Sequence, residues 1–230
     1  TASVKAVNLK NFRWEVGGSV GHYKNEVTAL PNNNRPVETD IYGATVLTQV
    51  GQPVGVFYGW DSDGVYATSA EAAAEGKYLV SGNGDHINFG AGDMRFKDVD
   101  NNHVIDNADR VVIGDPNPDL FGNIFTTLNW KNLTLSAAFN YSLGNDIYNY
   151  QRSLLEGGSL FLNQTTAMSR RWTTEGQHTN IPRVAYGDPM GNSRFSDRWI
   201  EDGSYLRLSS VTLSYHIPIV STYLQGITVW

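Results

Sequence analysis

The sequence predicts an all-β fold built from antiparallel strands. Its 230 residues include 23 glycines and are 12% aromatic but only 17% charged, and such a chain suits β structure better than a helix bundle. Four segments place apolar residues at every second position, as strands with one apolar face do. The segments are joined by connections of very unequal length, which is typical of β proteins with short turns at one end and long loops at the other.

The four alternating segments justify the predicted strands in chain order. They comprise residues 12–21, 120–130, 133–141 and 206–216. The tight turn Lys131-Asn132 joins the second and third segments, and a further turn is predicted around residues 218–222. In the fourth segment, Leu206 and Leu208 lie on the opposite parity to Val211. A bulge near Ser209 would restore one continuous apolar face.

Two long segments, residues 24–118 and 143–198, are predicted to be irregular because they are rich in Gly, Asn, Asp and Ser. Within them, Thr68-Ser-Ala-Glu71 is a capping box, and Gly76 follows as a stop signal, so a short helix is expected there. A second helical stretch is expected at residues 163–172. Outer-membrane β-barrels show this combination of short turns and long loops. Soluble β-sandwiches with long loops also have alternating strands, and the pattern alone favours the sandwich.

Charge and composition exclude several classes of protein. A net charge of -6 and a pI of about 5.3 argue against binding to nucleic acid. The absence of cysteine excludes disulfides and thiolate metal sites. No apolar run approaches the length of a membrane-spanning helix, so a helical membrane protein is excluded.

A calcium-binding loop is predicted between Asp98 and Asp109. Oxygen-bearing side chains stand at positions 1, 3, 5, 9 and 12 of this twelve-residue stretch, and a backbone carbonyl stands at position 7, as in an EF-hand loop. The predicted ligands are Asp98, Asp100, Asn102, the Val104 carbonyl, Asp106 and Asp109. His103 replaces the usual glycine and Asp109 the usual glutamate, and an Asx-rich turn without metal is the alternative.

The residues around the acidic loop indicate that it belongs to a β protein. Residues 92–97 and 110–118 are short apolar-polar pieces ended by glycine and proline, and neither reads as the helix that an EF-hand requires. The expected Ca²⁺ would therefore have a structural role, ordering a long loop.

No enzymatic chemistry is predicted for the chain. Six carboxylates could in principle supply a general acid and a nucleophile for glycoside cleavage: Asp61, Asp63, Asp85, Asp93, Glu201 and Asp202. Their spacing along the loops does not give their separation in space. The sequence has no nucleophile elbow, zinc-binding helix or phosphate-binding loop, and its five histidines lack ligand spacing.

An ordered set of sequence blocks carries a resemblance to a known family. The blocks are Gly51–Trp60 (GQPVGVFYGW), Gly92–Asp98 (GDMRFKD), Asp109–Asp119, Leu143–Asn149 (LGNDIYN) and Ser196–Leu208 (SDRWIEDGSYLRL). Together they span nearly the whole chain. The chain resembles the C-terminal part of the barrel in SusC/RagA-type TonB-dependent outer-membrane transporters of Bacteroidetes.

This resemblance implies a fold, a location and a function. Residues 1–230 would form part of one transmembrane β-barrel domain, with the plug domain and the closure of the barrel outside the chain, and residues 24–118 and 143–198 would be long extracellular loops. The family imports nutrients, glycans or peptides, through the outer membrane together with a SusD-like lipoprotein. TonB would act through regions outside this chain, and outer-membrane lipid would surround the strands.

Exposed loop aromatics are the predicted contacts for substrate and lipoprotein: Trp60, Tyr66, Tyr148 and Tyr150. An alternative function is a secreted, calcium-stabilised carbohydrate-binding β-sandwich, which would use the same metal loop and stack the same four rings, together with Phe89, on sugars.

Overall fold

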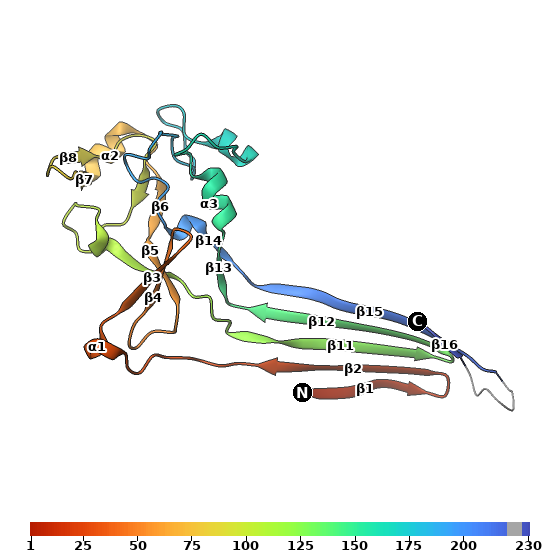
Figure 1. Cartoon of the computed structure of the whole chain (residues 1–230). Coiled ribbons are helices and arrows are strands. Elements are labelled where there is room, and N and C mark those ends of the chain that lie inside the picture. The colour runs from red at the N-terminus through yellow and green to blue at the C-terminus, as the bar shows by residue number, and fades with distance from the viewer. Residues whose placement is uncertain (220–226) are drawn as a thin grey trace. The chain divides into compact units, whose positions relative to one another are not determined.

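The computed structural model describes residues 1–219 and 227–230, which form two compact units (Figure 1). The sheet unit comprises residues 1–24, 117–145 and 202–230, and the loop unit comprises residues 25–116 and 146–201. The turn predicted around residues 218–222 lies largely outside the described residues. Among the described residues, no helix is long and apolar enough to cross a membrane.

The sheet unit is a single antiparallel sheet with the strand order β1-β2-β11-β12-β15-β16 (Figure 1). Its strands are β1 (Ala2–Leu9), β2 (Phe12–Gly21), β11 (Leu120–Trp130), β12 (Leu133–Leu143), β15 (Tyr205–Ile217) and β16 (Ile227–Val229). The four predicted strands are confirmed. The sequence did not reveal β1, because its pairing with β2 is irregular between Lys5 and Val7 and the extra residue interrupts the two-residue period.

The register confirms two local predictions. Trp130 pairs with Leu133, so Lys131 and Asn132 form a two-residue turn, and Lys131 has a φ of 51°. Ala138 pairs with Ser210 but Phe139 pairs with Leu208, which leaves Ser209 as the extra residue of a bulge. The Ser209 hydroxyl donates to the Ala138 carbonyl at 2.9 Å. The bulge therefore brings both halves of β15 onto one apolar face.

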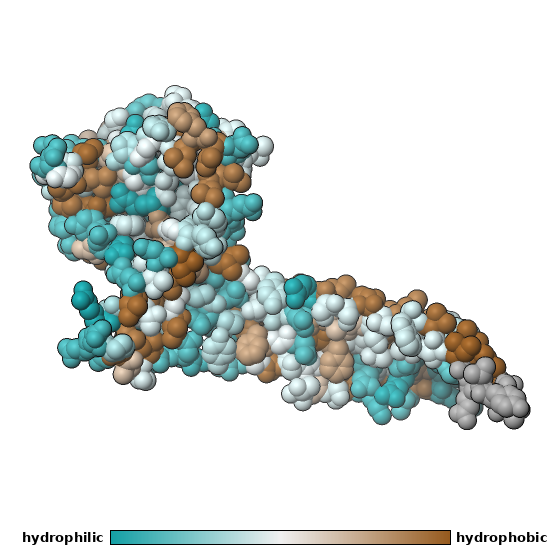
Figure 2. Space-filling view, in the orientation of Figure 1, coloured by the Kyte–Doolittle hydropathy of each residue, from teal (hydrophilic) through white to brown (hydrophobic). Residues whose placement is uncertain are grey.

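That apolar face is exposed. In register, Trp14 pairs with Leu128, Leu128 with Leu135, and Leu135 with Leu213, so the apolar positions form continuous rows across four strands. The exposed fraction is 66% for Leu206 on the same face, and Figure 2 shows hydrophobic residues running along β15. None of the described residues of the sheet unit is buried. A sandwich would bury this face against a second sheet, so the sheet does not match the alternative fold.

The loop unit contains far more regular structure than predicted. A four-stranded antiparallel sheet has the order β10-β5-β4-β3, and there are three further two-stranded sheets, β13-β14, β6-β9 and β7-β8. Its strands are β3 (Val37–Ile41), β4 (Ala44–Thr48), β5 (Val56–Trp60), β6 (Ser62–Val65), β7 (Tyr78–Val80), β8 (His86–Asn88), β9 (Met94–Phe96), β10 (Arg110–Gly114), β13 (Asp146–Tyr148) and β14 (Ile200–Asp202). The prediction of irregular loops was wrong because strands of three to five residues show too few alternations to be recognised.

The helices of the loop unit are short. They are α1 (Pro31–Asn34), α2 (Ser69–Glu75), α3 (Tyr150–Glu156) and the 3₁₀ turns η1 (Asn107–Asp109), η2 (Thr166–Arg170) and η3 (Asp197–Trp199). Helix α2 confirms the short helix predicted there, because the Thr68 hydroxyl accepts from Glu71 N at 3.1 Å and Gly76 has a φ of 62°. The Glu71 carboxylate accepts from Ala67 N rather than from Thr68 N, so the capping box is only half formed. The helix predicted at residues 163–172 is only η2, and α3 was not predicted.

Two hydrophobic clusters give the loop unit its own core. The larger is formed by Tyr66, Ala72, Phe89, Met94, Phe96, Ile105 and Met190. The smaller is formed by Ala44, Phe195 and Trp199. Because each cluster joins residues of 25–116 to residues of 146–201, the two long segments fold together as one body.

Candidate functional site

A small hollow in the loop unit, here called the tyrosine hollow, is the candidate binding site. It has a volume of about 210 Å³ and is lined by three tyrosines, by Phe195 and Trp199, and by three serines. The tyrosines are Tyr42, Tyr148 and Tyr150, and the serines are Ser153, Ser159 and Ser193. An aromatic wall with a few hydroxyls suits a ligand that has both a flat apolar face and hydrogen-bonding groups.

The three tyrosines of the hollow differ in how exposed their rings are. Tyr148 is half-buried, with its ring edge-on to Phe195 at 5.2 Å, and its hydroxyl donates to the Tyr42 carbonyl at 3.2 Å. Tyr42 and Tyr150 are 75% and 41% exposed, and their ring centroids are 5.2 Å apart. Tyr148 therefore forms the fixed wall, while Tyr42 and Tyr150 form an exposed aromatic pair at the rim.

Local sequence positions both exposed rings. Tyr42 and Gly43 form the two-residue turn between β3 and β4, with φ values of 50° and 84°. Positive φ at both positions is the hairpin turn that matches the twist of the strands. A tyrosine rarely adopts this conformation, and such strain is often found at functional sites. Tyr42 was not predicted from the sequence, because its place beside Tyr150 depends on the contact between its carbonyl and Tyr148, 106 positions along the chain.

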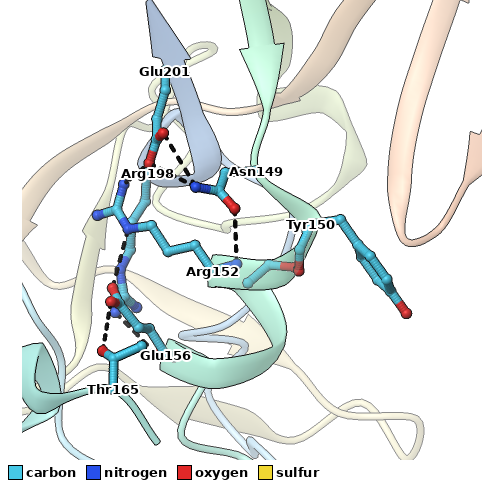
Figure 3. Close-up of polar contacts among 8 residues, drawn as sticks. Asn149, Tyr150, Arg152, Glu156, Thr165, Arg198 and Glu201 are labelled. Atoms are coloured by element: carbon cyan, nitrogen blue, oxygen red, sulfur yellow. Dashed lines mark hydrogen bonds and ion pairs between the residues drawn. The ribbon is translucent and has the colours of Figure 1, made fainter.

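Tyr150 begins α3, whose polar side is held by an ion-pair network (Figure 3). Arg152 contacts Glu156 through Nε at 3.0 Å and Glu201 through Nη1 at 2.9 Å. Asn149 caps the helix by accepting from Arg152 N at 2.9 Å and also donates to Glu201. Tyr150 points away from this network in Figure 3. The network thus fixes the helix and leaves the Tyr150 ring free.

The charged groups of the network are shifted by their surroundings. Burial raises the pKa of Glu156, but hydrogen bonds from Thr165 and Arg152 outweigh it and hold the pKa below its ordinary value. Burial, with the charge of Arg152 nearby, lowers the pKa of Arg198 to about 10. The Nε and Nη1 atoms of Arg198 are buried without a hydrogen-bond partner. These shifts mark the network as part of the scaffold of the loop unit.

Two other aromatics predicted to bind substrate or partner are not free to do so. Tyr66 is only 1% exposed and donates its hydroxyl to Glu75 at 2.8 Å, and burial raises its pKa well above the ordinary value. Trp60 is half-buried, and its indole N–H donates to the Asp106 carbonyl at 2.9 Å. Arg194 lies over its ring, 4.9 Å from the centroid. The prediction is wrong for Tyr66, because burial depends on the tertiary core rather than on the local sequence.

Three of the six carboxylates considered for catalysis are held by cations or amides. Asp61 pairs with Lys97 at 2.6 Å. Asp93 is fully buried, accepts two hydrogen bonds from Arg183 at 2.7 and 3.1 Å, and accepts a third from Asn192. Glu201 is held by Arg152 and Asn149. Such satisfied groups stabilise the fold and are poor general acids or bases.

The acidic loop brings together three of its predicted metal ligands. Carboxylate oxygens of Asp98, Asp100 and Asp109 lie within 4.8 Å of one another. All three carboxylates also accept hydrogen bonds from backbone N–H groups. Asn102 and Asp106 do the same, because their side-chain oxygens accept from Val104 N and Ala108 N, each at 2.6 Å. These two contacts belong to an Asx turn and a helix cap, and they are the kind of contact that the alternative of an Asx-rich turn predicts.

The donor set of this loop suits a hard divalent cation. Desolvation and then the charges of Asp109 and Asp98 raise the pKa of Asp100, although a backbone N–H opposes the shift. A bound cation would offset this repulsion. His103 has a φ of 65°, so it adopts the left-handed conformation in which such a loop usually has glycine.

The chain is similar to TonB-dependent receptors over nearly its whole length. It is 32% identical to TonB-dependent receptor P3 of Formosa agariphila, covering 94% of this chain and 21% of the relative. It is 28% identical to receptor P26 of the same organism and 23% identical to TonB-dependent receptor SusC of Bacteroides thetaiotaomicron. The match with receptor P26 covers 96% of this chain and 22% of the relative, and the match with SusC covers 93% and 19%. It thus spans about a fifth of the length of these relatives.

Solved structures share the fold. The RagAB peptide transporter matches 97% of this chain with a TM-score of 0.70 and 20% identity, covering 23% of that chain. The RagAB peptide importer in its open-open state matches 99% with a TM-score of 0.69 and 19% identity, covering 24% of that chain. No family model matches the chain. These similarities confirm the resemblance that the sequence blocks indicated. They also confirm the predicted fold class, antiparallel strands of a β-barrel.

Proposed function

We infer that the chain is part of a SusC/RagA-type TonB-dependent receptor in the outer membrane of a Gram-negative bacterium, and we propose that this receptor imports nutrients. One observation supports the role of this part of the chain: an antiparallel sheet exposes a continuous apolar face and has no buried described residue. Lipid is the environment in which such a face is stable.

The dimensions of the sheet agree with a membrane-spanning role. Strands β11 and β12 each have 11 residues. At about 3.4 Å per residue and a tilt of about 45°, each spans roughly 26 Å, close to the apolar band of about 25 Å in outer-membrane barrels. The apolar face would contact lipid, and the Asn, Ser and Thr side chains of the other face would line the interior.

The loop unit would supply contacts for the substrate and for a SusD-like lipoprotein. The exposed pair Tyr42 and Tyr150, with serine hydroxyls beside it, would stack on a sugar ring or on a flat side chain of a peptide. The named relatives are receptors and transporters. We propose accordingly that the chain is not an enzyme, and that Asp61, Asp93 and Glu201 have structural roles.

Two substitutions in the full-length receptor test the role of the tyrosine hollow. Tyr42→Ala and Tyr150→Ala should each weaken binding of an imported oligosaccharide or peptide about fivefold, because one aromatic contact contributes about 1 kcal/mol. Binding is measured by titration calorimetry on detergent-purified receptor. Tyr186→Ala is the matched control, since Tyr186 is 70% exposed but does not line the hollow.

An equal loss in all three variants, or none, would count against the hollow as a substrate site. Asp61→Asn and Asp63→Asn test the enzymatic alternative. Hydrolysis of glycans or peptides by the purified receptor that only these two changes abolish would show that the chain is an enzyme.

A further inference from the structure

We propose that the hairpin turns at one end of the sheet bind the phosphate of anionic phospholipid headgroups. The turn rim, defined as Lys10, Asn11, Lys131 and Asn132, closes the hairpins β1–β2 and β11–β12. This proposal rests on the outer-membrane location inferred above, and it adds a specific lipid contact to it.

The register makes the two turns one surface. Phe12 pairs with Trp130, so the turns at residues 10–11 and 131–132 are neighbours, and Lys131 N donates to the Asn11 carbonyl at 2.9 Å. A hollow of about 560 Å³ lies against the rim. Lys10, Lys131 and Arg13 line it, and no carboxylate does.

Charge is distributed unevenly along the chain. The sheet unit has six Lys and Arg residues against three Asp and Glu residues, a formal charge of +3, although the whole chain carries -6. Arg13 is neutralised by Glu15 at 2.7 Å. Lys10 and Lys131 have no carboxylate within 4.0 Å among the residues that the structure describes. Two adjacent turns thus present unpaired ammonium groups.

An aromatic row next to the rim indicates where these amines lie in a membrane. Phe12, Trp130 and Tyr215 occupy one row of the register on the apolar face, together with Leu133. Trp130 is 57% exposed, and Lys131 Nζ lies 5.8 Å from the centroid of its ring. Aromatic girdles lie at the boundary between hydrocarbon and headgroups. Lys10 and Lys131, one or two residues beyond this row, therefore lie at the level of the phosphates.

This arrangement fits a lipid better than a free anion. A headgroup phosphate would pair with the two ammonium groups, and its acyl chains would lie against the apolar face beside Trp130. Inorganic phosphate would gain only the electrostatic contact, which exposed lysines provide weakly in water.

Native mass spectrometry of the full-length receptor tests the proposal. The receptor in detergent is mixed with phosphatidylglycerol or with phosphatidylethanolamine. The detergent is then removed in the mass spectrometer, and the lipids that stay bound are counted. Lys10→Gln with Lys131→Gln should weaken phosphatidylglycerol binding about thirtyfold, because each lysine near an anionic lipid surface contributes about fivefold. Lys5→Gln with Arg207→Gln is the control, since it removes the same charge from the sheet unit away from the turn rim.

The outcomes separate this proposal from the inferred location. Equal binding by the two double variants would overturn it, as would displacement of the lipid by millimolar inorganic phosphate, which would indicate a simple anion site. A lower Tm of the rim variant in lipid-free detergent would also overturn it, because the lysines would then pair within the protein. If the receptor is not found in outer-membrane fractions, the inferred location is wrong. That result is independent of the lipid experiment.

Discussion

At the residue scale, Asp109 links the two parts of the acidic loop. It is 1% exposed, and its two oxygens accept from Val99 N at 2.8 Å and from Asp106 N at 2.9 Å. A buried carboxylate beside Asp98 and Asp100 is stable only when hydrogen bonds or a cation offset its charge. The structure shows the hydrogen bonds. We propose that Ca²⁺ adds to them.

Calcium should bind the acidic loop with an affinity in the extracellular range, a Kd of about 0.1 to 1 mM, because His103 occupies the strained position usually taken by glycine. Asp100→Asn should abolish binding in titration calorimetry, and the loop should become more sensitive to proteolysis without calcium. Asp85→Asn, an exposed carboxylate outside the loop, should change neither. A wild-type loop that is equally protected with and without millimolar calcium would reduce it to a metal-free Asx turn.

Glu156 should make the loop unit sensitive to acid. Its pKa in the folded protein lies below the ordinary 4.5, so its stabilising contribution is complete above about pH 4.5 and is lost as the pH falls through the lower folded value. Glu156→Gln should lower stability by about 1 to 3 kcal/mol at pH 7, since Arg152 loses a charged partner.

Thermal melts of wild type and Glu156→Gln between pH 3 and pH 7 check this sign. The difference in Tm should shrink below pH 4.5. A difference that stays constant or grows on acidification would contradict the assignment. Glu175→Gln is the control, because Glu175 accepts only from Ser69 and has no arginine partner among the described contacts.

At the element scale, close approach between β2 and β11 requires a small residue. Gly122 pairs with Val20 and Tyr141, and a Cβ at this position would clash with the Ser19 carbonyl. The Tyr141 hydroxyl donates to the same carbonyl at 3.2 Å. The glycine therefore lets the strands pair and lets Tyr141 reach across β11 to β2.

Gly122→Val should disrupt the pairing of β2 with β11 although valine favours strands, because the clash involves backbone that cannot move without breaking the ladder. The amount of protease-resistant receptor in isolated outer membranes should fall severalfold. Leu128→Val, on the same face of the same strand, should leave that amount nearly unchanged. Normal assembly of Gly122→Val would show that the strands separate more easily than the register implies.

At the scale of the whole molecule, the two units differ in character: the sheet unit has an exposed apolar face, and the loop unit is acidic. The sheet unit carries +3 and the chain -6, so the loop unit carries a formal charge of -9. The net charge that excludes nucleic acid thus belongs to the loop unit alone. We propose that this unit lies outside the cell and that the turn rim faces the periplasm.

Single cysteines in the full-length receptor test this topology. Phe161→Cys, at a position 90% exposed in the loop unit, should react with a membrane-impermeant maleimide on intact cells, whereas Asn132→Cys should not. Both should react after the cells are permeabilised, which controls for accessibility. Labelling of Asn132→Cys alone on intact cells would invert the orientation.

Local features of this protein were determined by its sequence. The alternation in β2, β11, β12 and β15, the turn at Lys131-Asn132, the bulge at Ser209 and the cap of α2 follow from neighbours within a few positions. They could be predicted because each depends on spacing and on local hydrogen bonds. The ordered sequence blocks likewise indicated the family.

Only the tertiary structure decided which side chains are exposed. Tyr66 and Tyr150 are both loop tyrosines, yet Tyr66 is enclosed by Phe89 and its neighbours while Tyr150 meets Tyr42 at the rim of a hollow. Strands β3 to β10 owe their stability to the same long-range contacts. Burial depends on segments that meet from distant parts of the chain, so the local pattern of residues could not specify it.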